Sequence, residues 1–362
     1  MSETKLPAPN GWIILDKPRE LGSTQAVAAV KRNLREGGYA KTKVGHGGTL
    51  DPLAEGVLPI ALGEATKLAG RMLDASKIYE FTIQFGEETD TLDSEGAVVQ
   101  SSNQRRPMAA IAAILEHFTG EIDQVPPKYS ALKVDGKRSY DLARAGEEVE
   151  LKTRRVTIHS LFLPGTGRGT SEAGGGAPSD QRTVPLHHPA DGPPPPVGEE
   201  LVSTFQTTTG RPDPYDPGAP LELADAITLT AHVSKGTYIR SLARDIARAL
   251  GTVGHVTYLR RTKAGPFLEK QAIPLDKLNE VGKGAPLEDV ILPLEAGLDD
   301  IPALDLTSEQ AAAVRQGRVL TGQPQADGLY CAMLRNIPVA LVELVGGSAK
   351  VVRGFNLHDV AE

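Results

Sequence analysis

The sequence predicts an α+β protein, because it contains segments with helical periodicity, segments with strand periodicity and a C-terminal part made of short strands. Residues 23–34 repeat apolar side chains at helical spacing, and Ser23 is a suitable N-cap for such a helix. Residues 79–85 alternate apolar and polar side chains, which is typical of a half-buried strand. Residues 108–118 again have the spacing of an amphipathic helix.

The second half of the chain continues this pattern and then changes character. Residues 227–233 alternate like a strand, and residues 237–250 have helical spacing. From about residue 296 onward, short apolar segments separated by glycine turns predict strands at 339–344 and 350–355. We therefore expect a large α+β body followed by a small β domain.

Length and composition indicate a soluble protein with more than one domain. The chain has 362 residues, of which 40% are hydrophobic and 23% are charged, as is ordinary for globular proteins. No apolar run approaches the length of a membrane span, and residues 1–7 lack the pattern of a signal peptide. The single cysteine, Cys331, excludes an internal disulfide and is expected to be a small core residue. From these absences we expect a cytoplasmic location. We also expect a monomer, since no oligomerisation signal stands out.

The net charge of −7 argues against a protein that coats nucleic acid with its whole surface, yet the basic residues are unevenly distributed. Three basic groups lie beside the motifs described below, a pattern that suits local phosphate contacts. The alternative is that each group is only a solvated face. The first group is Lys31, Arg32, Arg35, Lys41 and Lys43; the second is Lys128, Lys133, Lys137, Arg138 and Arg144; the third is Lys235, Arg240, Arg244, Arg248, Arg260, Arg261 and Lys263.

Two segments differ in composition from the rest of the chain. Residues 124–153 are polar and basic, and we expect them to form an arm that projects from the core. Residues 164–220 are dominated by glycine and proline and cannot bury enough apolar surface to offset their ordering entropy. We expect a disordered insertion there. We expect it to be a surface loop without a function of its own, and the alternative is a tethering role.

The most informative segment runs from Val44 to Gly56, with the sequence Val-Gly-His-Gly-Gly-Thr-Leu-Asp-Pro-Leu-Ala-Glu-Gly. Its glycines let the backbone turn tightly and let a ligand approach closely. Asp51 precedes a proline, which favours an extended backbone, and an apolar stretch follows the loop. A carboxylate held in this way can act as a nucleophile or base in a dry pocket. The alternative is a glycine-rich turn with a solvated aspartate.

This segment resembles the catalytic motif of the TruB-type tRNA pseudouridine-55 synthases, and three other segments resemble that family in the expected order. They are residues 11–18 (GWIILDKP), 128–133 (KYSALK) and 233–240 (VSKGTYIR). The resemblance covers roughly residues 10–162 and 224–362. It implies a pseudouridine synthase fold over residues 10–295, with a mixed, mainly antiparallel sheet flanked by helices, and a PUA-like RNA-binding domain over residues 296–362.

The resemblance implies that the chain converts uridine 55 in the T-loop of tRNA to pseudouridine and that Asp51 is the catalytic carboxylate. Covalent addition by Asp51 and removal of a sugar proton both remain open. Tyr79 matches the active-site tyrosine, which can stack on the flipped uracil and take the proton from C5. Arg240 matches the arginine that pairs with the catalytic carboxylate. Glu55 has no such match and is expected to be a solvated or structural acid.

Four more residues border the site in this resemblance. His46 matches the residue that intrudes into the tRNA loop when the target base leaves the stack, with a structural histidine bonded within its turn as the alternative. Tyr238 is expected to line the uracil pocket. Lys17 and Leu259 match the lysine-proline and leucine-arginine motifs that border the site, although Lys17 suits the capping of a strand equally well.

Isomerisation transfers no electrons and adds no atoms, so we expect no redox cofactor, nucleotide or metal. The sequence has no Gly-x-x-x-x-Gly-Lys-Ser/Thr phosphate loop and no His-Glu-x-x-His zinc pair. The expected partner is the T-arm of tRNA. One alternative is a guide-RNA-dependent relative that modifies ribosomal RNA, which is not expected to carry an arm at residues 124–153. The other is a non-catalytic tRNA-binding or folding module, against which the intact Asp51 argues.

Overall fold

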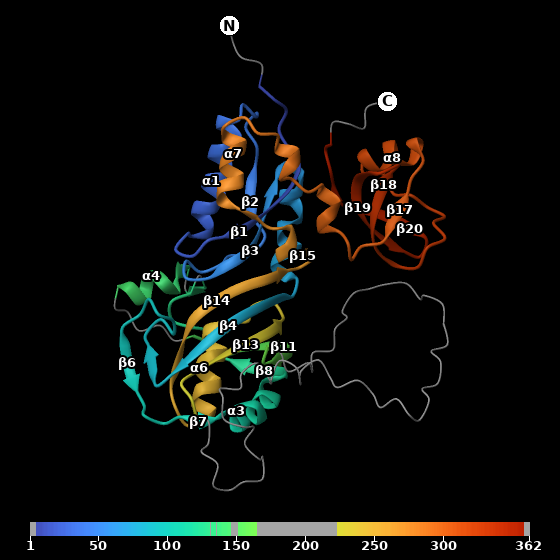
Figure 1. Ribbon diagram of the computed structural model, residues 1–362. Helices are drawn as coiled ribbons and strands as arrows, with labels where there is room; N and C mark the ends of the chain where they lie inside the picture. The colour runs from blue at the N-terminus through green and yellow to red at the C-terminus, as the bar shows by residue number, and fades with distance from the viewer. Residues whose placement is uncertain (1–4, 131, 135, 146–150, 165–222, 358–362) are drawn as a thin grey trace, which may run out of the picture. The chain divides into compact units, whose positions relative to one another are not determined.

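The computed structural model describes residues 5–130, 132–134, 136–145, 151–164 and 223–357 (Figure 1). The chain divides into two compact units. The terminal unit contains Met1–Ile78 and Leu259–Glu362, and the central unit contains Tyr79–Tyr258. The predicted insertion at residues 164–220 lies outside the described residues from residue 165 onward.

The terminal unit is built on a sheet in which the strand order is β16-β1-β3-β14. Its strands are β1 (Gly11–Lys17), β2 (Val44–His46), β3 (Glu55–Leu62), β14 (Gly254–Ala264, of which residues 259–264 belong here), β15 (Phe267–Leu268) and β16 (Ile273–Pro274). β1 runs antiparallel to β3, in a register from Gly11 opposite Leu62 to Lys17 opposite Gly56. β14 runs parallel to β3, and β2 runs antiparallel to it. The sheet is therefore mixed.

The helices of the terminal unit are α1 (Ser23–Glu36), α2 (Ala69–Asp74) and α7 (Leu275–Gly282), with 3₁₀ turns η1 (Gly63–Leu68), η3 (Glu269–Gln271), η4 (Leu287–Asp289) and η5 (Leu294–Gly297). Figure 1 shows α1 and α7 side by side, and the amide of Asn33 donates a hydrogen bond of 3.0 Å across them to Asn279 Oδ1. The predicted helix over 23–34 is confirmed. Its predicted N-cap is wrong, because the cap is Gly22 and the Ser23 hydroxyl is engaged elsewhere.

The core of the terminal unit surrounds Trp12 on β1, which is fully buried. Its indole N–H donates to the Leu294 carbonyl oxygen at 3.1 Å, and its ring packs 5.1 Å from that of Phe267. The same apolar cluster includes Cys331 and Leu341 from the C-terminal strands. Cys331 is the small core residue that the sequence predicts, and burial raises the pKa of its thiol to about 11.

The C-terminal part of this unit is a sheet of its own with the order β17-β18-β19-β20. Its elements are β17 (Ala303–Asp305), α8 (Ser308–Arg315), β18 (Gly328–Leu334), β19 (Ile337–Val345) and β20 (Ser348–Gly354). The strands predicted at 339–344 and 350–355 are confirmed as β19 and β20. A second apolar cluster, which includes Val314 of α8 and Val342 of β19, lies inside this small β domain.

The central unit has a sheet in the order β14-β4-β13-β11-β8, with residues 254–258 of β14 at one side. Its strands include β4 (Lys77–Phe85, of which residues 79–85 belong here), β8 (Gly120–Gln124), β11 (Arg154–Phe162) and β13 (Ala226–Val233). β11 is antiparallel to both β13 and β8. Short pairs are formed by β5 (Glu87–Thr89) with β6 (Val98–Ser101), and by β7 (Arg106–Pro107) with β12 (Leu223–Ala224).

The helices of the central unit are α3 (Met108–Leu115), followed by η2 (Glu116–Phe118), α4 (Ser139–Arg144) and α6 (Ile239–Ala249). Together with β4 and β13 they confirm the elements predicted at 79–85, 108–118, 227–233 and 237–250. Within the predicted arm at 124–153, the described residues form the strand pair β9 (Lys133–Val134) with β10 (Lys137–Arg138), and then α4. In the described part of the chain, no helix has the length and apolar character needed to cross a membrane.

Candidate active site

The loop between β2 and β3, residues 47–54, carries Asp51 in the terminal unit. Leu50, Leu53 and Ala54 turn inward and are buried, whereas Asp51 is half-buried. The Asp51 carbonyl oxygen accepts a hydrogen bond of 3.1 Å from Ala54 N–H. The loop is thus packed against the unit by its apolar residues while the aspartate stays at the surface of that packing.

Arg261 on β14 holds the first half of this loop. It is only 1% exposed, and a buried guanidinium must be matched by acceptors because an unpaired buried charge is costly. Its donors reach three backbone carbonyl oxygens, those of Val57 at 2.8 Å, Gly48 at 3.1 Å and Thr49 at 3.3 Å. A planar cation with several donors therefore joins the start of the loop that carries Asp51 to β3.

Lys17 at the end of β1 holds the second half of the loop. This side chain is fully buried, and its ammonium donates to the carbonyl oxygens of Pro18 at 2.9 Å, Leu21 at 2.6 Å and Pro52 at 3.3 Å. Pro52 directly follows Asp51. The structure therefore places the predicted border residue Lys17 on the backbone beside Asp51, where it connects two turns.

Ser23 makes a third tie, in place of the predicted cap. Its hydroxyl donates to the Leu50 carbonyl oxygen at 2.9 Å and accepts from the Leu50 N–H at 2.8 Å, and the side chain is buried. Both backbone groups of the residue preceding Asp51 are satisfied by this one hydroxyl. The start of α1 is thereby fixed to the loop.

Two glycines of the motif are required by contacts. A Cβ on Gly47 would lie 2.6 Å from the Cβ of Met72, closer than real side chains approach. Gly56 has φ of +98°, and a Cβ there would lie 2.3 Å from the Arg261 carbonyl oxygen. The motif thus needs glycine at these positions so that the loop can pack tightly on both sides.

His46 ends β2 and is half-buried. Its Nδ1 accepts a long contact of 3.4 Å from Gly48 N–H. Burial, with a smaller contribution from the positive charge of Arg261, lowers the pKa of His46 below its usual 6.5. The imidazole is therefore neutral at pH 7, and this ring stands at the entrance of the loop that carries Asp51.

Glu55 and Leu259 have simple environments. Glu55 pairs with Arg260 at 3.2 Å, and the same guanidinium lies 3.0 Å from Asp16, so Glu55 is a structural acid as expected. Leu259 precedes Arg260 on β14 and is buried with 6% exposed. The structure thus places Leu259 in the packing of the terminal unit.

In the central unit, Arg240 lies at the start of α6 and is 5% exposed. Its guanidinium pairs with the Asp93 carboxylate at 3.2 Å and donates to the carbonyl oxygens of Thr91 at 2.8 Å and Tyr129 at 3.0 Å. The predicted pairing of Arg240 with Asp51 involves a residue of the other unit and stays a prediction. Asp93 was not singled out from the sequence.

The two tyrosines of the predicted site also belong to the central unit. Tyr79 lies on β4 and Tyr238 caps α6, and both are half-buried. The side-chain amide of Gln124 forms two hydrogen bonds with the backbone of Tyr238. It donates to the Tyr238 carbonyl oxygen at 3.1 Å and accepts from the Tyr238 N–H at 2.8 Å. The end of β8 therefore sets the position of the residue two before Arg240.

The arginines of the third basic group make contacts inside the protein, and the expected role of the group in phosphate contacts stays a prediction. Arg240 and Arg261 are buried, and Arg260 is in ion pairs. Arg244 pairs with the neighbouring Asp245 at 2.8 Å, and Arg248 pairs with Glu88 at 2.7 Å. These five arginines therefore contribute to holding loops and helices in place.

No group of three or more histidine, cysteine or acidic side chains arranged to hold a metal ion occurs among the residues that the structure covers. The terminal unit presents the half-buried Asp51 carboxylate and the neutral imidazole of His46, and the central unit, described by itself, presents the buried Arg240 and two half-buried tyrosines.

Comparisons with known proteins identify the family. Residues 35–167 match the model of the TruB family pseudouridylate synthase (N terminal domain), and residues 240–299 match the tRNA pseudouridylate synthase B C-terminal domain. Relatives named tRNA pseudouridine synthase B include that of Novosphingobium aromaticivorans, 62% identical over 98% of this chain and 99% of the relative. That of Zymomonas mobilis is 49% identical over the same shares.

The solved structures that resemble this chain support the fold. A structure of an H/ACA RNP bound to a substrate RNA containing 2′-deoxyuridine has a TM-score of 0.62 and 22% identity, over 96% of this chain and 86% of that one. The archaeal box H/ACA sRNP Nop10-Cbf5 complex has a TM-score of 0.60, at 22% identity, over 97% and 87%. The predicted pseudouridine synthase fold is confirmed. The extent of identity with the curated relatives shows that this chain belongs to the TruB family of pseudouridylate synthases.

Proposed function

We propose that this protein isomerises uridine to pseudouridine at position 55, in the T-loop of tRNA. The observation that carries the proposal is the fixation of the Asp51 loop, where Arg261, Lys17 and Ser23 bind backbone groups on both sides of one half-buried carboxylate. Such positioning is what a reacting group needs to meet a substrate atom in a fixed geometry. The relatives that are 62% and 49% identical are named tRNA pseudouridine synthase B, which supports tRNA as the substrate.

The reaction breaks the bond between C1′ and N1, turns the uracil, and forms a bond between C1′ and C5. The proton on C5 leaves and N1 gains a proton, so atoms and electrons balance without an oxidant or reductant. Asp51 acts in its ionised form in either path, whether it adds covalently or removes a sugar proton. Tyr79 stacks on the uracil and takes the C5 proton at the end of the reaction.

The reacting atoms are reached only when the base leaves the RNA stack. His46 fills the space that the flipped uridine vacates, and a neutral imidazole suits stacking in that space better than a charged one, because desolvation disfavours the charge. Tyr238 lines the uracil pocket, Lys17 and Leu259 border the site, and Arg240 pairs with the catalytic carboxylate.

The experiment is to incubate the purified protein with an unmodified tRNA transcript, without added cofactor or guide RNA, and to map pseudouridine at single-nucleotide resolution. We expect one new pseudouridine, at position 55, and none with the Asp51→Asn variant, which should keep tRNA affinity within several-fold. Binding without any pseudouridine would replace this proposal with a non-catalytic tRNA-binding module. Activity that requires a guide RNA and ribosomal RNA would indicate the guide-dependent class.

The proposal includes a monomer that acts on the T-arm in the cytoplasm. A hairpin of the T-arm alone is therefore expected to be a substrate. Light scattering of the purified protein is expected to give the mass of one chain of 38.4 kDa, and a dimer mass would contradict this part.

A further inference from the structure

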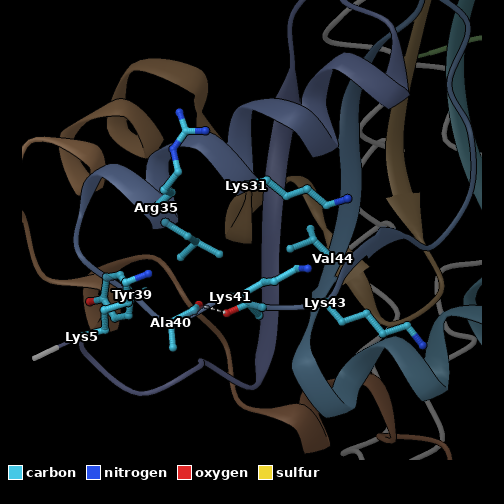
Figure 2. Close-up of a pocket in the computed structure, with 10 residues that line it drawn as sticks. Lys5, Lys31, Arg35, Tyr39, Ala40, Lys41, Lys43 and Val44 are labelled. Carbon is cyan, nitrogen blue, oxygen red and sulfur yellow. Dashed lines mark hydrogen bonds between the residues drawn. The ribbon is translucent and has the colours of Figure 1, made fainter.

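The terminal unit contains a pocket outside the candidate active site, with a volume of about 700 Å³. Figure 2 shows its lining, which comes from the C-terminal half of α1, from the segment between α1 and β2, and from Lys5 near the N-terminus. Leu34 and Val44 are buried and contribute apolar walls. Its other lining side chains include the cations Lys5, Lys31, Arg35, Lys41 and Lys43.

We propose that this pocket binds backbone phosphates of the substrate RNA, outside the nucleotide that is isomerised. The inference rests on the proposed function, since that function brings RNA to this unit. The ligand chemistry is a phosphate oxyanion, and the source is the RNA chain.

The charge of the pocket is the first argument. Among the residues that the structure describes, no carboxylate lines it, although the protein carries a net charge of −7. Within the described ranges, Lys31, Lys41 and Lys43 are exposed and have no acidic partner, in contrast to the arginines of the third basic group. Positive groups that line one cavity repel each other and attract an anion. An anion that binds there offsets this repulsion.

A purely structural explanation accounts for only part of this cluster. Cations near the C-terminus of a helix are stabilised by the helix dipole, and this applies to Arg35 in the last turn of α1. Arg35 also lies 3.6 Å from Glu36, but both side chains are largely exposed, so this pair contributes little. Lys41 and Lys43 follow the helix in the segment that leads into β2 and gain nothing from its dipole.

The position of the pocket is the second argument. Val44 lines the pocket and begins β2, and His46 ends the same strand. Two residues of extended chain span about 7 Å, so the pocket begins within one nucleotide's reach of the predicted RNA contact. Figure 2 shows the ammonium ends of Lys31 and Lys41 near Val44. An RNA whose loop reaches His46 therefore presents its backbone to these ammonium groups.

The chemistry of lysine fits this role. An ammonium group is a compact, strongly hydrated point charge that holds phosphate without reading sequence. The hydroxyl of Thr42 donates to the Ala40 carbonyl oxygen at 2.9 Å and orders the segment between Tyr39 and Val44. The pocket thus positions RNA through its backbone while the loop at Asp51 selects and modifies the base.

The test measures tRNA affinity against salt concentration for the double variant Lys31→Ala/Lys41→Ala. Loss of two phosphate contacts is expected to reduce the slope of log K against log salt by roughly 1.5, and to weaken binding about tenfold at 0.1 M salt. The matched control is Lys277→Ala/Lys283→Ala, which removes two exposed charges of the same unit outside the pocket and is expected to match the wild type. Lys31→Arg/Lys41→Arg keeps both charges and is expected to retain the slope.

The source of the phosphate is distinguished with inorganic tripolyphosphate. We expect it to compete with tRNA on the wild type and to compete much less on Lys31→Ala/Lys41→Ala. If Lys31→Ala/Lys41→Ala keeps the wild-type affinity and slope for tRNA, the inference is wrong. Binding of tripolyphosphate to the wild type in that case would show that the pocket is a site for small anions and not for RNA. A wild type that binds tRNA with the expected slope yet forms no pseudouridine would instead count against the proposed function alone.

Discussion

The carboxylate of Asp93 and the guanidinium of Arg240 form an ion pair of 3.2 Å, with 4% and 6% of their side chains exposed. Asp93 is itself held by the Thr91 hydroxyl at 2.6 Å and by Glu95 N–H at 3.1 Å. A buried pair of this kind adds little to the stability of the protein, because desolvation of both charges offsets much of their attraction. It does fix the position of the two side chains. Its consequence is that the orientation of Arg240 depends on Asp93.

We therefore predict that Asp93→Asn lowers both stability and activity. Removal of one partner leaves a buried guanidinium without its counter-charge, which costs on the order of 3 kcal/mol. The measurements are urea unfolding and the single-turnover rate of pseudouridine formation. In a double-mutant cycle with Arg240→Met, the coupling energy is expected to be about 1–3 kcal/mol, and strictly additive effects would show that the two side chains do not depend on each other.

Arg261→Met is expected to loosen the loop that carries Asp51. The change removes hydrogen bonds from a charged group to three carbonyl oxygens, and the bonds to Val57 and Gly48 are buried, so we predict a loss of about 2–4 kcal/mol in unfolding free energy. The rate at saturating tRNA should fall at least tenfold. Arg260→Met is the control, because this neighbour is 18% exposed and forms ion pairs in place of loop contacts. Equal rate losses for both variants would argue against a specific role of Arg261.

Gly47→Ala tests the packing of the same loop from the other side. The new methyl group would lie 2.6 Å from the Met72 Cβ, so the loop or α2 must shift, and overpacking of this kind costs about 1–3 kcal/mol. Gly45→Ala is the matched control, since nothing lies within 4 Å of a Cβ at that position. We expect Gly45→Ala to change stability by less than about 0.5 kcal/mol. The measurement is thermal unfolding of the two variants, whose substituted positions lie two residues apart. Equal losses of stability in both variants would contradict the packing argument.

The pH dependence of stability is expected to include His46. Its pKa in the folded protein is lowered by burial and by Arg261, so the unfolded chain binds more protons than the folded one below pH 6.5. The unfolding free energy therefore rises with pH through this window, and the stabilisation is lost as pH falls through the folded pKa. The measurement is chemical unfolding of wild type and His46→Asn at pH 7.5 and 5.5.

We expect the wild type to lose more stability than His46→Asn between those pH values. His117→Gln, a change at an exposed histidine of the central unit, serves as the control and should follow the wild type. A wild type and a His46→Asn variant with the same pH dependence would show that His46 does not titrate between pH 7.5 and 5.5 in a way that is linked to folding.

Much of the fold could be predicted from the sequence, because local periodicity decides which residues become helix or strand. The amphipathic spacing of residues 23–34 and the alternation at 79–85 each produced the element they indicate, α1 and β4. The loop around Asp51 was recognisable because its glycines permit tight turns and its proline favours an extended backbone at Asp51. The apolar environment of Cys331 followed from residue type alone.

What only the tertiary structure decided is which polar groups meet across long sequence separations. Ser23 suits an N-cap by local rules, but its hydroxyl bonds both backbone groups of Leu50, 27 residues away. Arg261 is indistinguishable in sequence from Arg260, and only the register of β14 against β3 buries one of them under the loop and leaves the other in ion pairs. The free energy of a buried charge depends on the partners that surround it, and those partners are brought together by packing. The sequence by itself therefore determined the elements and singled out the loop that carries Asp51, whereas the tertiary structure decided which cations hold that loop and which remain exposed at the surface.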